Sequence, residues 1–259
     1  MKKIIGFLLV LVFFTACNQL ADNEFIIEGT IEGIENGKKA VLETQDETGM
    51  GLKATDSVVI KDGKFTFKGT VEEPELRFVQ VEGVNGKAVF VLENGEINMK
   101  IFKDSVNKTI IGGTFNNEQF AKYNLEQGKI QKKIMDYRKV NMEKMQTALK
   151  DKDSLTINAL RDGFTNLQKE LNEYNITFSE KNPKAFISVL MLENMFYQPD
   201  LDIEKIKKIY NNLDKSIQAT KPGKKIGDMI ANHNAAEVGK KAPDFSGPTP
   251  DGKTVSLKE

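Results

Sequence analysis

Two reactive side chains occur only once each in this sequence, because Cys17 is its single cysteine and His233 its single histidine. A lone cysteine cannot form a disulfide or a Cys-x-x-Cys redox pair within its own chain. A lone histidine cannot supply a two-histidine metal site unless a second molecule contributes. We therefore predict no catalytic, cofactor-binding or metal-binding residue and expect no cofactor. We interpret His233 as a surface residue near the end of a short helix.

The segment before Cys17 has the composition of a secretory signal peptide. Lys2 and Lys3 supply positive charge, residues 4–14 form an almost unbroken apolar run, and small residues follow. An apolar helix of that length spans about 16 Å, which is half of the ~30 Å hydrocarbon core of a bilayer. We therefore predict a signal peptide at residues 1–16 and disfavour the alternative, a membrane-spanning helix.

The residues that end in Cys17 resemble a bacterial lipobox, in which the cysteine thiol is lipidated and the cysteine becomes the first residue. The alternative for Cys17 is a buried or free thiol. Two or more acyl chains anchor a protein stably where one attaches it reversibly, so lipidation would keep this protein on a membrane. Asn18 and Gln19 stand where an acidic residue retains some lipoproteins at the inner membrane. We predict a cell-envelope lipoprotein, on the outer membrane facing the periplasm, with a lipid-anchored linker at residues 17–23.

Composition and length limit the remaining functions. The 37 basic and 37 acidic residues give no net charge that would attract nucleic acid, so we expect no nucleic-acid partner. In the predicted helices, acidic side chains alternate with lysines, which is typical of solvent-exposed faces rather than of a paired-carboxylate site. The length predicts more than one structural unit.

Residues 24–115 have the pattern of an antiparallel β-domain. Phe65 and Phe67 alternate with polar residues, as do Ile97 and Met99. Two-residue turn signals suited to tight hairpins separate such runs, at Asn36-Gly37, Asp62-Gly63, Asn85-Gly86 and Asn94-Gly95. About eight strands are predicted, at residues 24–32, 39–44, 55–61, 64–71, 76–83, 87–93, 96–102 and 107–112. They predict a sandwich or a partly open barrel.

Residues 116–236 predict a helical spacer domain, because apolar residues there recur three or four positions apart. The expected helices cover residues 116–150, 154–181, 182–197, 202–218 and 224–234. Asn182 and Pro183 predict the start of the third helix, which should be the most buried because it is apolar nearly all round. The apolar stripes of the first two helices are predicted to be the core of a helical bundle, and they include Tyr123, Ile130, Ile134, Met142, Leu149, Leu155 and Leu160. The alternative is a groove for a partner helix or a hydrophobic ligand, since methionine side chains are adaptable.

The end of the sequence carries two spaced phrases, Gly239-x-x-Ala242-Pro243-x-Phe245 and Asp251-Gly252-x-x-Val255-x-Leu257. Residues 238–259 resemble the opening of a thioredoxin-like domain of the TlpA/ResA and AhpC/TSA type. In that family the phrases form a hairpin that precedes a Cys-x-x-Cys pair. The resemblance implies thiol–disulfide exchange, by residues that lie beyond Glu259. We therefore expect residues 237–259 to be the truncated start of that domain and to be loosely packed.

The β-domain also resembles a family. Residues 25–31, 56–69 and 90–93, the last followed by Gly95, resemble a domain of unknown function that commonly sits at the N-terminus of thioredoxin-like lipoproteins. The resemblance implies the order β-domain, helical spacer and redox domain. That family has no established catalytic residues, so it adds none here.

The predicted fold class is α+β, with an N-terminal antiparallel β-sandwich or partly open barrel, then a helical bundle, then the first hairpin of a thioredoxin-like domain. The resemblance implies that the chain is the N-terminal anchor and spacer of a membrane-tethered thiol–disulfide oxidoreductase, lacking the redox cysteines and inactive alone. Its partners would be the membrane, through the lipid anchor, and periplasmic protein thiols or disulfides. The alternative is a non-enzymatic cell-envelope lipoprotein that binds a ligand or a protein through its β-domain.

Overall fold

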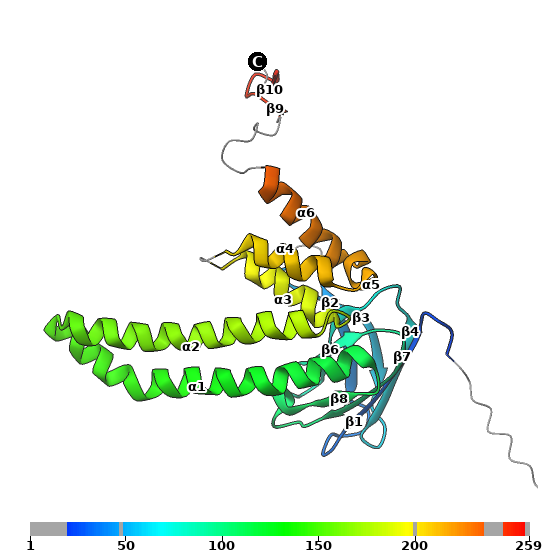
Figure 1. The fold of residues 1–259 in the computed structure, drawn as a ribbon. Helices are drawn as coiled ribbons and strands as arrows, with labels where there is room; N and C mark the ends of the chain where they lie inside the picture. The colour runs from blue at the N-terminus through cyan, green and yellow to red at the C-terminus, as the bar shows by residue number, and fades with distance from the viewer. Residues whose placement is uncertain (1–19, 47–48, 199–200, 236–245, 257–259) are drawn as a thin grey trace, which may run out of the picture.

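The computed structural model describes residues 20–46, 49–198, 201–235 and 246–256. In these residues two four-stranded sheets come first, six helices follow, and a separate two-stranded sheet lies near the C-terminus (Figure 1). Apart from that C-terminal sheet, strands and helices are segregated along the chain, as the change of apolar period after Thr114 predicts.

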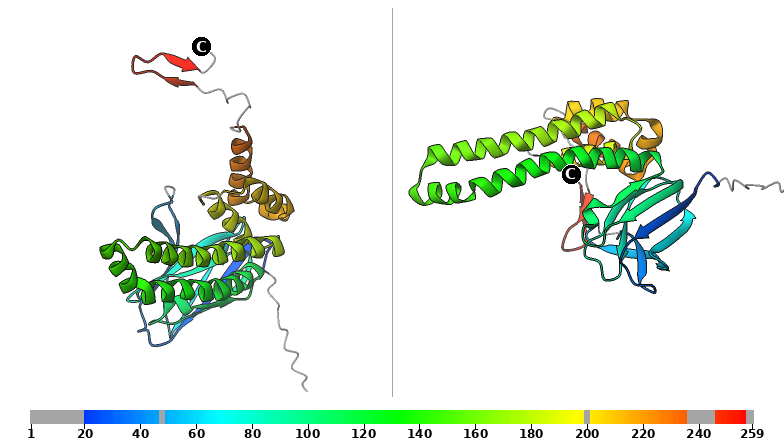
Figure 2. Two further views of the ribbon diagram at one scale, coloured as in Figure 1. Left: turned by 60° about the vertical axis from the view of Figure 1, so that its left-hand side comes forward. Right: turned by 90° about the horizontal axis from the view of Figure 1, so that it is seen from below.

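The strands of the two larger sheets lie close to their predicted positions, except that the strand predicted over 107–112 begins only at Ile110. They are β1 (Glu24–Ile31), β2 (Lys39–Gln45), β3 (Leu52–Val59), β4 (Lys64–Thr70), β5 (Glu75–Val81), β6 (Ala88–Leu92), β7 (Gly95–Ile101) and β8 (Ile110–Gly112). A 3-10 turn, η1 (Val106–Lys108), precedes β8. One sheet has the strand order β4-β1-β7-β8 and the other β3-β2-β5-β6, and Figure 2 shows them beside the helices from two further sides.

The prediction of a purely antiparallel domain is wrong at one strand pair. β1 runs parallel to β7, with Phe25 opposite Gly95 and Ile31 opposite Ile101. After β1 the chain crosses to the other sheet to form β2 and β3, so the neighbours of β1 are strands that come later in the chain. Alternation of apolar residues sets which face of a strand is buried, but it does not set which strand lies beside it.

Alternate side chains of both sheets point into one shared apolar core. Its fully buried members include Ile27 of β1, Phe67 of β4 and Phe90 of β6. The ring of Phe65 lies across Gly29, where it fills the space that a Cβ atom would take. The sheets are not closed into a barrel, because β4 and β8 end one sheet and β3 and β6 end the other.

The helices follow the sheets and begin with a long hairpin. They are α1 (Phe115–Asp151), α2 (Ser154–Lys181), α3 (Phe186–Phe196), α4 (Ile203–Asn212), α5 (Lys215–Ala219) and α6 (Lys221–Ala235). α1 and α2 run side by side beyond the sheets (Figure 1). Where they join, Lys152 has a left-handed φ of 55°, and the Asp153 carboxylate accepts a hydrogen bond from the Thr156 N–H at 3.1 Å. None of the described helices combines the length and apolar composition needed to span a bilayer.

Two predicted helix boundaries are wrong. α3 begins at Phe186, later than Asn182 and Pro183 predict, because the chain first makes a turn after α2. The helix predicted over 202–218 is two helices, α4 and α5. The helical conformation is interrupted before Asp214, and the carboxylate of that residue caps the second helix. Aspartate competes with the helix for backbone N–H groups, so it starts a helix more readily than it continues one.

Burial along the helices agrees with the prediction for α3 and for Tyr123, Ile130, Ile134 and Leu160 of the hairpin, and it contradicts the prediction for three other residues in the far half of the hairpin. Phe186 and Leu192 of α3 are fully buried, as predicted for that helix. Met142, Leu149 and Leu155 are 58%, 53% and 85% exposed, although they were predicted to be core. α3 packs on α1 and α2 at the end near the sheets, so the far end of the hairpin is a two-helix contact with exposed outer faces.

The two-stranded sheet near the C-terminus is made of β9 (Ser246–Pro248) and β10 (Thr254–Ser256), which pair antiparallel. Val255 is 46% exposed, in agreement with the predicted loose packing. Phe245 and Leu257, the other two apolar side chains of that prediction, lie outside the described residues.

Candidate functional site

Of the two reactive side chains that occur once in the sequence, His233 lies in the part of the chain that the structure describes. Cys17, the predicted lipidation site, and the signal peptide predicted at residues 1–16 lie outside the described residues, so both stay predictions. His233 lies near the end of α6, as predicted, but it is partly buried, and its Nδ1 has no hydrogen-bond partner among the described residues. In the described part of the chain, no group of three or more His, Cys, Asp or Glu side chains could hold a metal ion.

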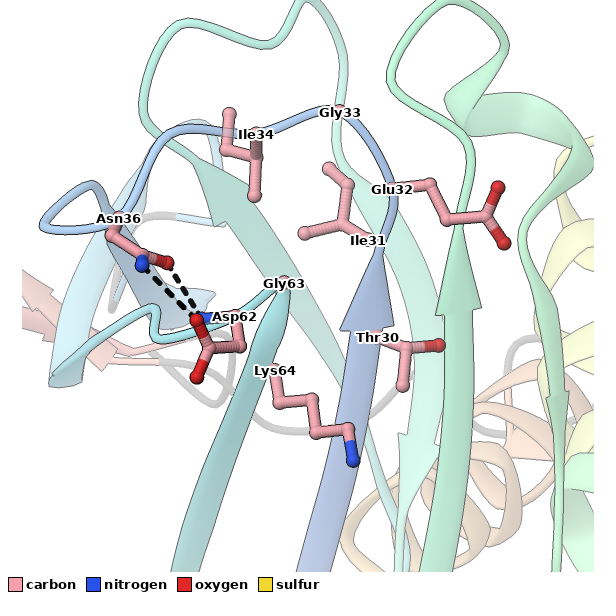
Figure 3. Close-up of a pocket in the computed structure, with 9 residues that line it drawn as sticks. All are labelled: Thr30, Ile31, Glu32, Gly33, Ile34, Asn36, Asp62, Gly63 and Lys64. Carbon is pink, nitrogen blue, oxygen red and sulfur yellow. Dashed lines mark hydrogen bonds between the residues drawn. The ribbon is translucent and has the colours of Figure 1, made fainter.

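A depression of about 590 Å³ lies beside the turns that follow β1 and precede β4 (Figure 3). The Asp62 N–H donates to Asn36 Oδ1 at 2.6 Å, and Asn36 Nδ2 donates to Asp62 Oδ1 at 3.2 Å. Figure 3 shows Glu32 on the other side of β1 from Asp62, and Glu32 pairs with Lys100 at 3.0 Å. The Asp62 and Glu32 carboxylates therefore have different partners and do not form an acid–base pair. This depression lies between two turns that hydrogen bonds join.

A larger cleft, of about 800 Å³, lies between β6, β8 and the start of α1, and we call it the β6–β8 cleft. Val89 of β6, Ile110 of β8 and Leu125 of α1 line it and are 37%, 63% and 64% exposed. β6 and β8 are edge strands of their sheets. The cleft therefore lies where both sheets are open, and it combines an apolar lining with two strand edges that no further strand covers.

The charged groups of the β6–β8 cleft are lysines. Lys87 and Lys108 line it, and no aspartate or glutamate does. Lys87 Nζ pairs with Glu43 Oε2 at 2.5 Å, whereas Lys108 is exposed and forms no ion pair with a described carboxylate. Amides and a hydroxyl complete the polar lining, at Asn107, Thr109, Asn117 and Asn124. This set of groups suits the binding of an anionic, partly apolar partner rather than nucleophilic catalysis.

Asn117 of α1 covers part of the open edge of β6. Its Oδ1 accepts a hydrogen bond from the Val91 N–H at 3.0 Å, and its Nδ2 donates to the Val91 carbonyl at 2.7 Å. Val91 lies opposite Leu76 of β5, and these backbone groups point away from β5, where a further strand would pair. Val91 and Asn117 are 0% and 1% exposed. The side-chain amide therefore takes the place of a neighbouring strand.

Asn116 ties α1 and α3 to the residue that follows β6. Glu93 Oε1 accepts from the Asn116 N–H and Glu93 Oε2 from Asn116 Nδ2, both at 2.7 Å. Asn116 Oδ1 accepts the Phe186 N–H at 2.7 Å, which is one of the N–H groups at a helix start that have no partner within the helix. Glu93 and Asn116 are 8% and 6% exposed. The network is buried and hydrogen-bonded, so it fixes the helices relative to the cleft.

An aromatic cluster holds α1 to α2 behind this junction. The Tyr123 ring centroid lies 5.6 Å from that of Tyr174 and 5.2 Å from that of Phe178. The Tyr123 hydroxyl donates to Asn175 Oδ1 at 2.9 Å. Burial, with a smaller contribution from Tyr174, raises the pKa of Tyr123 to about 12. The phenol is therefore neutral at physiological pH and acts as a structural donor, not as a proton-transfer group.

The sequence analysis did not single out Glu93, Asn116 or Asn117. Two asparagines at the start of a helix have the composition of an exposed cap, and nothing in their type indicates burial. The short connection from β8 to α1 does not identify them either. It keeps the first turn of α1 near β8, whereas Asn116 and Asn117 bond to Glu93 and Val91 of the other sheet.

One comparison with known proteins identifies a part of this chain. Residues 25–120 match the family model described as Domain of unknown function (DUF4369). No curated protein and no solved structure matches the chain. The matched range runs from Phe25 in β1 to Phe120 in α1, so it includes Asn117 and most of the lining of the β6–β8 cleft. Residues 25–120 comprise the two four-stranded sheets and the start of α1, which covers the edge of β6. The match shows that these residues are a DUF4369 domain.

Proposed function

We propose that this chain is the anchor and spacer portion of a membrane-tethered thiol–disulfide oxidoreductase of the thioredoxin-like type. The observation that carries the proposal is the antiparallel hairpin of β9 and β10. It forms from the segment whose phrases resemble the opening of a thioredoxin-like domain. The DUF4369 match at residues 25–120 supports the same order of domains, because the resemblance of that segment implies a redox domain downstream.

In such an enzyme a thiolate of a Cys-x-x-Cys pair attacks a disulfide of the substrate protein and forms a mixed disulfide, while one substrate sulfur leaves as a thiolate. The second cysteine then attacks the mixed disulfide, so the substrate gains two electrons and the enzyme pair becomes a disulfide. Cys17 is the single cysteine of this sequence, so the chemistry requires sulfur atoms outside it. The sheets and helices described above would separate an acylated N-terminus from the redox centre.

A second candidate is a non-enzymatic envelope lipoprotein that binds a partner through its β-domain. The β6–β8 cleft favours it, because the cleft lies within the DUF4369 domain and offers apolar and cationic groups to a ligand. The coding sequence downstream of Glu259 separates the two candidates. A Cys-x-x-Cys pair soon after that residue supports the oxidoreductase, and a stop codon supports the binding protein.

Cys17→Ala is expected to move the protein from the membrane fraction to the soluble fraction of a bacterial host, because it removes the acyl attachment point. The measurement is metabolic labelling with an alkyne-bearing fatty acid, followed by membrane fractionation and blotting. Lys139→Ala, on an exposed part of α1, is the control and should keep both the label and the membrane location. Recovery of unlabelled wild-type protein with a free thiol at Cys17 would contradict the lipid anchor.

The 259-residue polypeptide is expected not to accelerate the reduction of insulin by dithiothreitol, because it has no cysteine pair to exchange electrons. Turbidity of the released insulin chain is followed over time, with a thioredoxin as the positive control. The rate should equal that of dithiothreitol alone. Faster reduction that depends on the amount of polypeptide would show that the redox centre lies within this sequence.

A further inference from the structure

We propose that the β6–β8 cleft binds an extended peptide segment in which acidic side chains alternate with apolar ones, and that this segment pairs with the open edge of β6. The inference goes beyond the anchor and spacer function and does not depend on it. It rests on three features of the cleft: the direction of the backbone groups of β6, the apolar lining, and the sign of the charges.

The backbone of β6 presents a free pairing edge to the cleft. β6 pairs on one side with β5 and ends its sheet on the other. Because Val91 directs its N–H and C=O away from β5 to Asn117, Val89, two residues earlier, directs its own N–H and C=O the same way. No described residue outside the strand pairing bonds to these two groups. Asn117 thus occupies one pairing position of the edge and leaves the next one open to a ligand strand.

The cleft can also receive the apolar side chains of such a strand. Val89, Ile110 and Leu125 come from three different elements and are 37%, 63% and 64% exposed on its walls. The cleft has a volume of about 800 Å³, which lies within the range of pockets that hold small ligands and short peptide segments. Alternate side chains of a bound strand point to opposite faces, so the apolar residues of the peptide would share one face and its acidic residues the other.

The charge of the lining selects an acidic partner. Lys87 and Lys108 line the cleft and no carboxylate does. Lys87 already pairs with Glu43, so an ion pair with Lys108 would contribute more to the binding of an incoming carboxylate. Complementary charge raises the association rate and rejects partners of the wrong sign. A peptide with lysine in place of glutamate should therefore bind much more weakly than its acidic counterpart.

Fluorescence polarisation with a fluorescein-labelled octapeptide of alternating valine and glutamate tests the proposal. We expect saturable binding to the full chain, and we expect Lys108→Glu and Leu125→Glu each to weaken it by about tenfold or more. Both positions are exposed, so the variants should keep the melting temperature of the wild type. Lys139→Glu, which makes the same charge change on an exposed part of α1 outside the cleft, is the matched control and should bind like the wild type.

Two further peptides test the mode of binding. The valine–lysine octapeptide should fail to bind, and the acidic peptide with N-methylated central valines should bind at least about tenfold more weakly, because methylation removes the donors that pair with an edge strand. Equal binding of the methylated peptide would overturn strand pairing, and equal binding of the lysine peptide would overturn the charge selection. Absence of binding to the acidic peptide would overturn the proposal as a whole. This holds also if Leu125→Glu converts a dimer of this chain into monomers, because a second copy of the chain would then be the partner of the cleft.

Discussion

Asn117→Ala is expected to lower the free energy of unfolding by about 2 to 4 kcal/mol, because it leaves both the N–H and the C=O of Val91 without partners. Val91 is 0% exposed, so its N–H and C=O depend on the Asn117 amide rather than on water. Urea unfolding followed by far-ultraviolet circular dichroism measures the change, since the sequence contains no tryptophan to report it by fluorescence.

Two comparisons isolate the role of the Asn117 amide. Asn124→Ala removes the same side chain two helical turns later, at an exposed position, and should change the free energy of unfolding by no more than about 0.5 kcal/mol. Asn117→Asp keeps the acceptor for the Val91 N–H but sets a carboxylate oxygen against the Val91 carbonyl, so it should be at least as unstable as Asn117→Ala. Equal effects of the two alanine variants would show that the amide does not stand in for a strand.

Gly29→Ala is expected to lower the free energy of unfolding by about 1 to 3 kcal/mol, the usual range for an overfilled core. A Cβ atom at this position would lie 1.9 to 2.4 Å from three ring carbons of Phe65. Phe65 is 3% exposed and packs edge-on against Phe67, with 5.8 Å between the ring centroids. The ring therefore cannot move aside without disturbing the core that both sheets share. The measurement is again urea unfolding.

The control for Gly29→Ala is Gly112→Ala in β8, where a Cβ atom would meet nothing within 4 Å and no loss of stability is expected. A double-mutant cycle with Phe65→Leu tests the contact itself. The smaller side chain leaves room for a methyl group, so Gly29→Ala should cost less in the Phe65→Leu background than in the wild type. An equal cost in both backgrounds would mean that the glycine is required for another reason.

The positions of the strands could be predicted because a period of two is a local property. Phe65 and Phe67 were predicted to share a face, and they are 3% and 1% exposed in one core. The parallel pairing of β1 with β7 could not be predicted, since nothing in the composition of Phe25 to Ile31 distinguishes one neighbouring strand from another. The prediction that Met142 and Leu149 are buried in the α1–α2 hairpin is wrong for the same reason. These residues lie on an apolar stripe, but a stripe on one helix does not specify whether a third helix packs against it.

The candidate site was largely beyond prediction. Lys87, Val89 and Leu125 come from separate elements and meet only in the folded chain. Asn117 acts on a backbone group, and the pattern of side chains does not encode which backbone groups face an open edge. Cys17 differs from these residues, because the predicted signal peptide and lipobox are patterns of consecutive residues. Its lipidation stays a prediction.

β1 cannot be completed on the growing polypeptide until β7 has been synthesised. Ile27 lies opposite Phe67 on one side and Ile97 on the other, so the earliest strand to leave the ribosome is among the last to be enclosed. Contacts this distant in sequence form slowly, and partly covered strands are prone to join the wrong neighbour meanwhile. β1 therefore keeps one open edge until β7, the sixth strand after it, arrives.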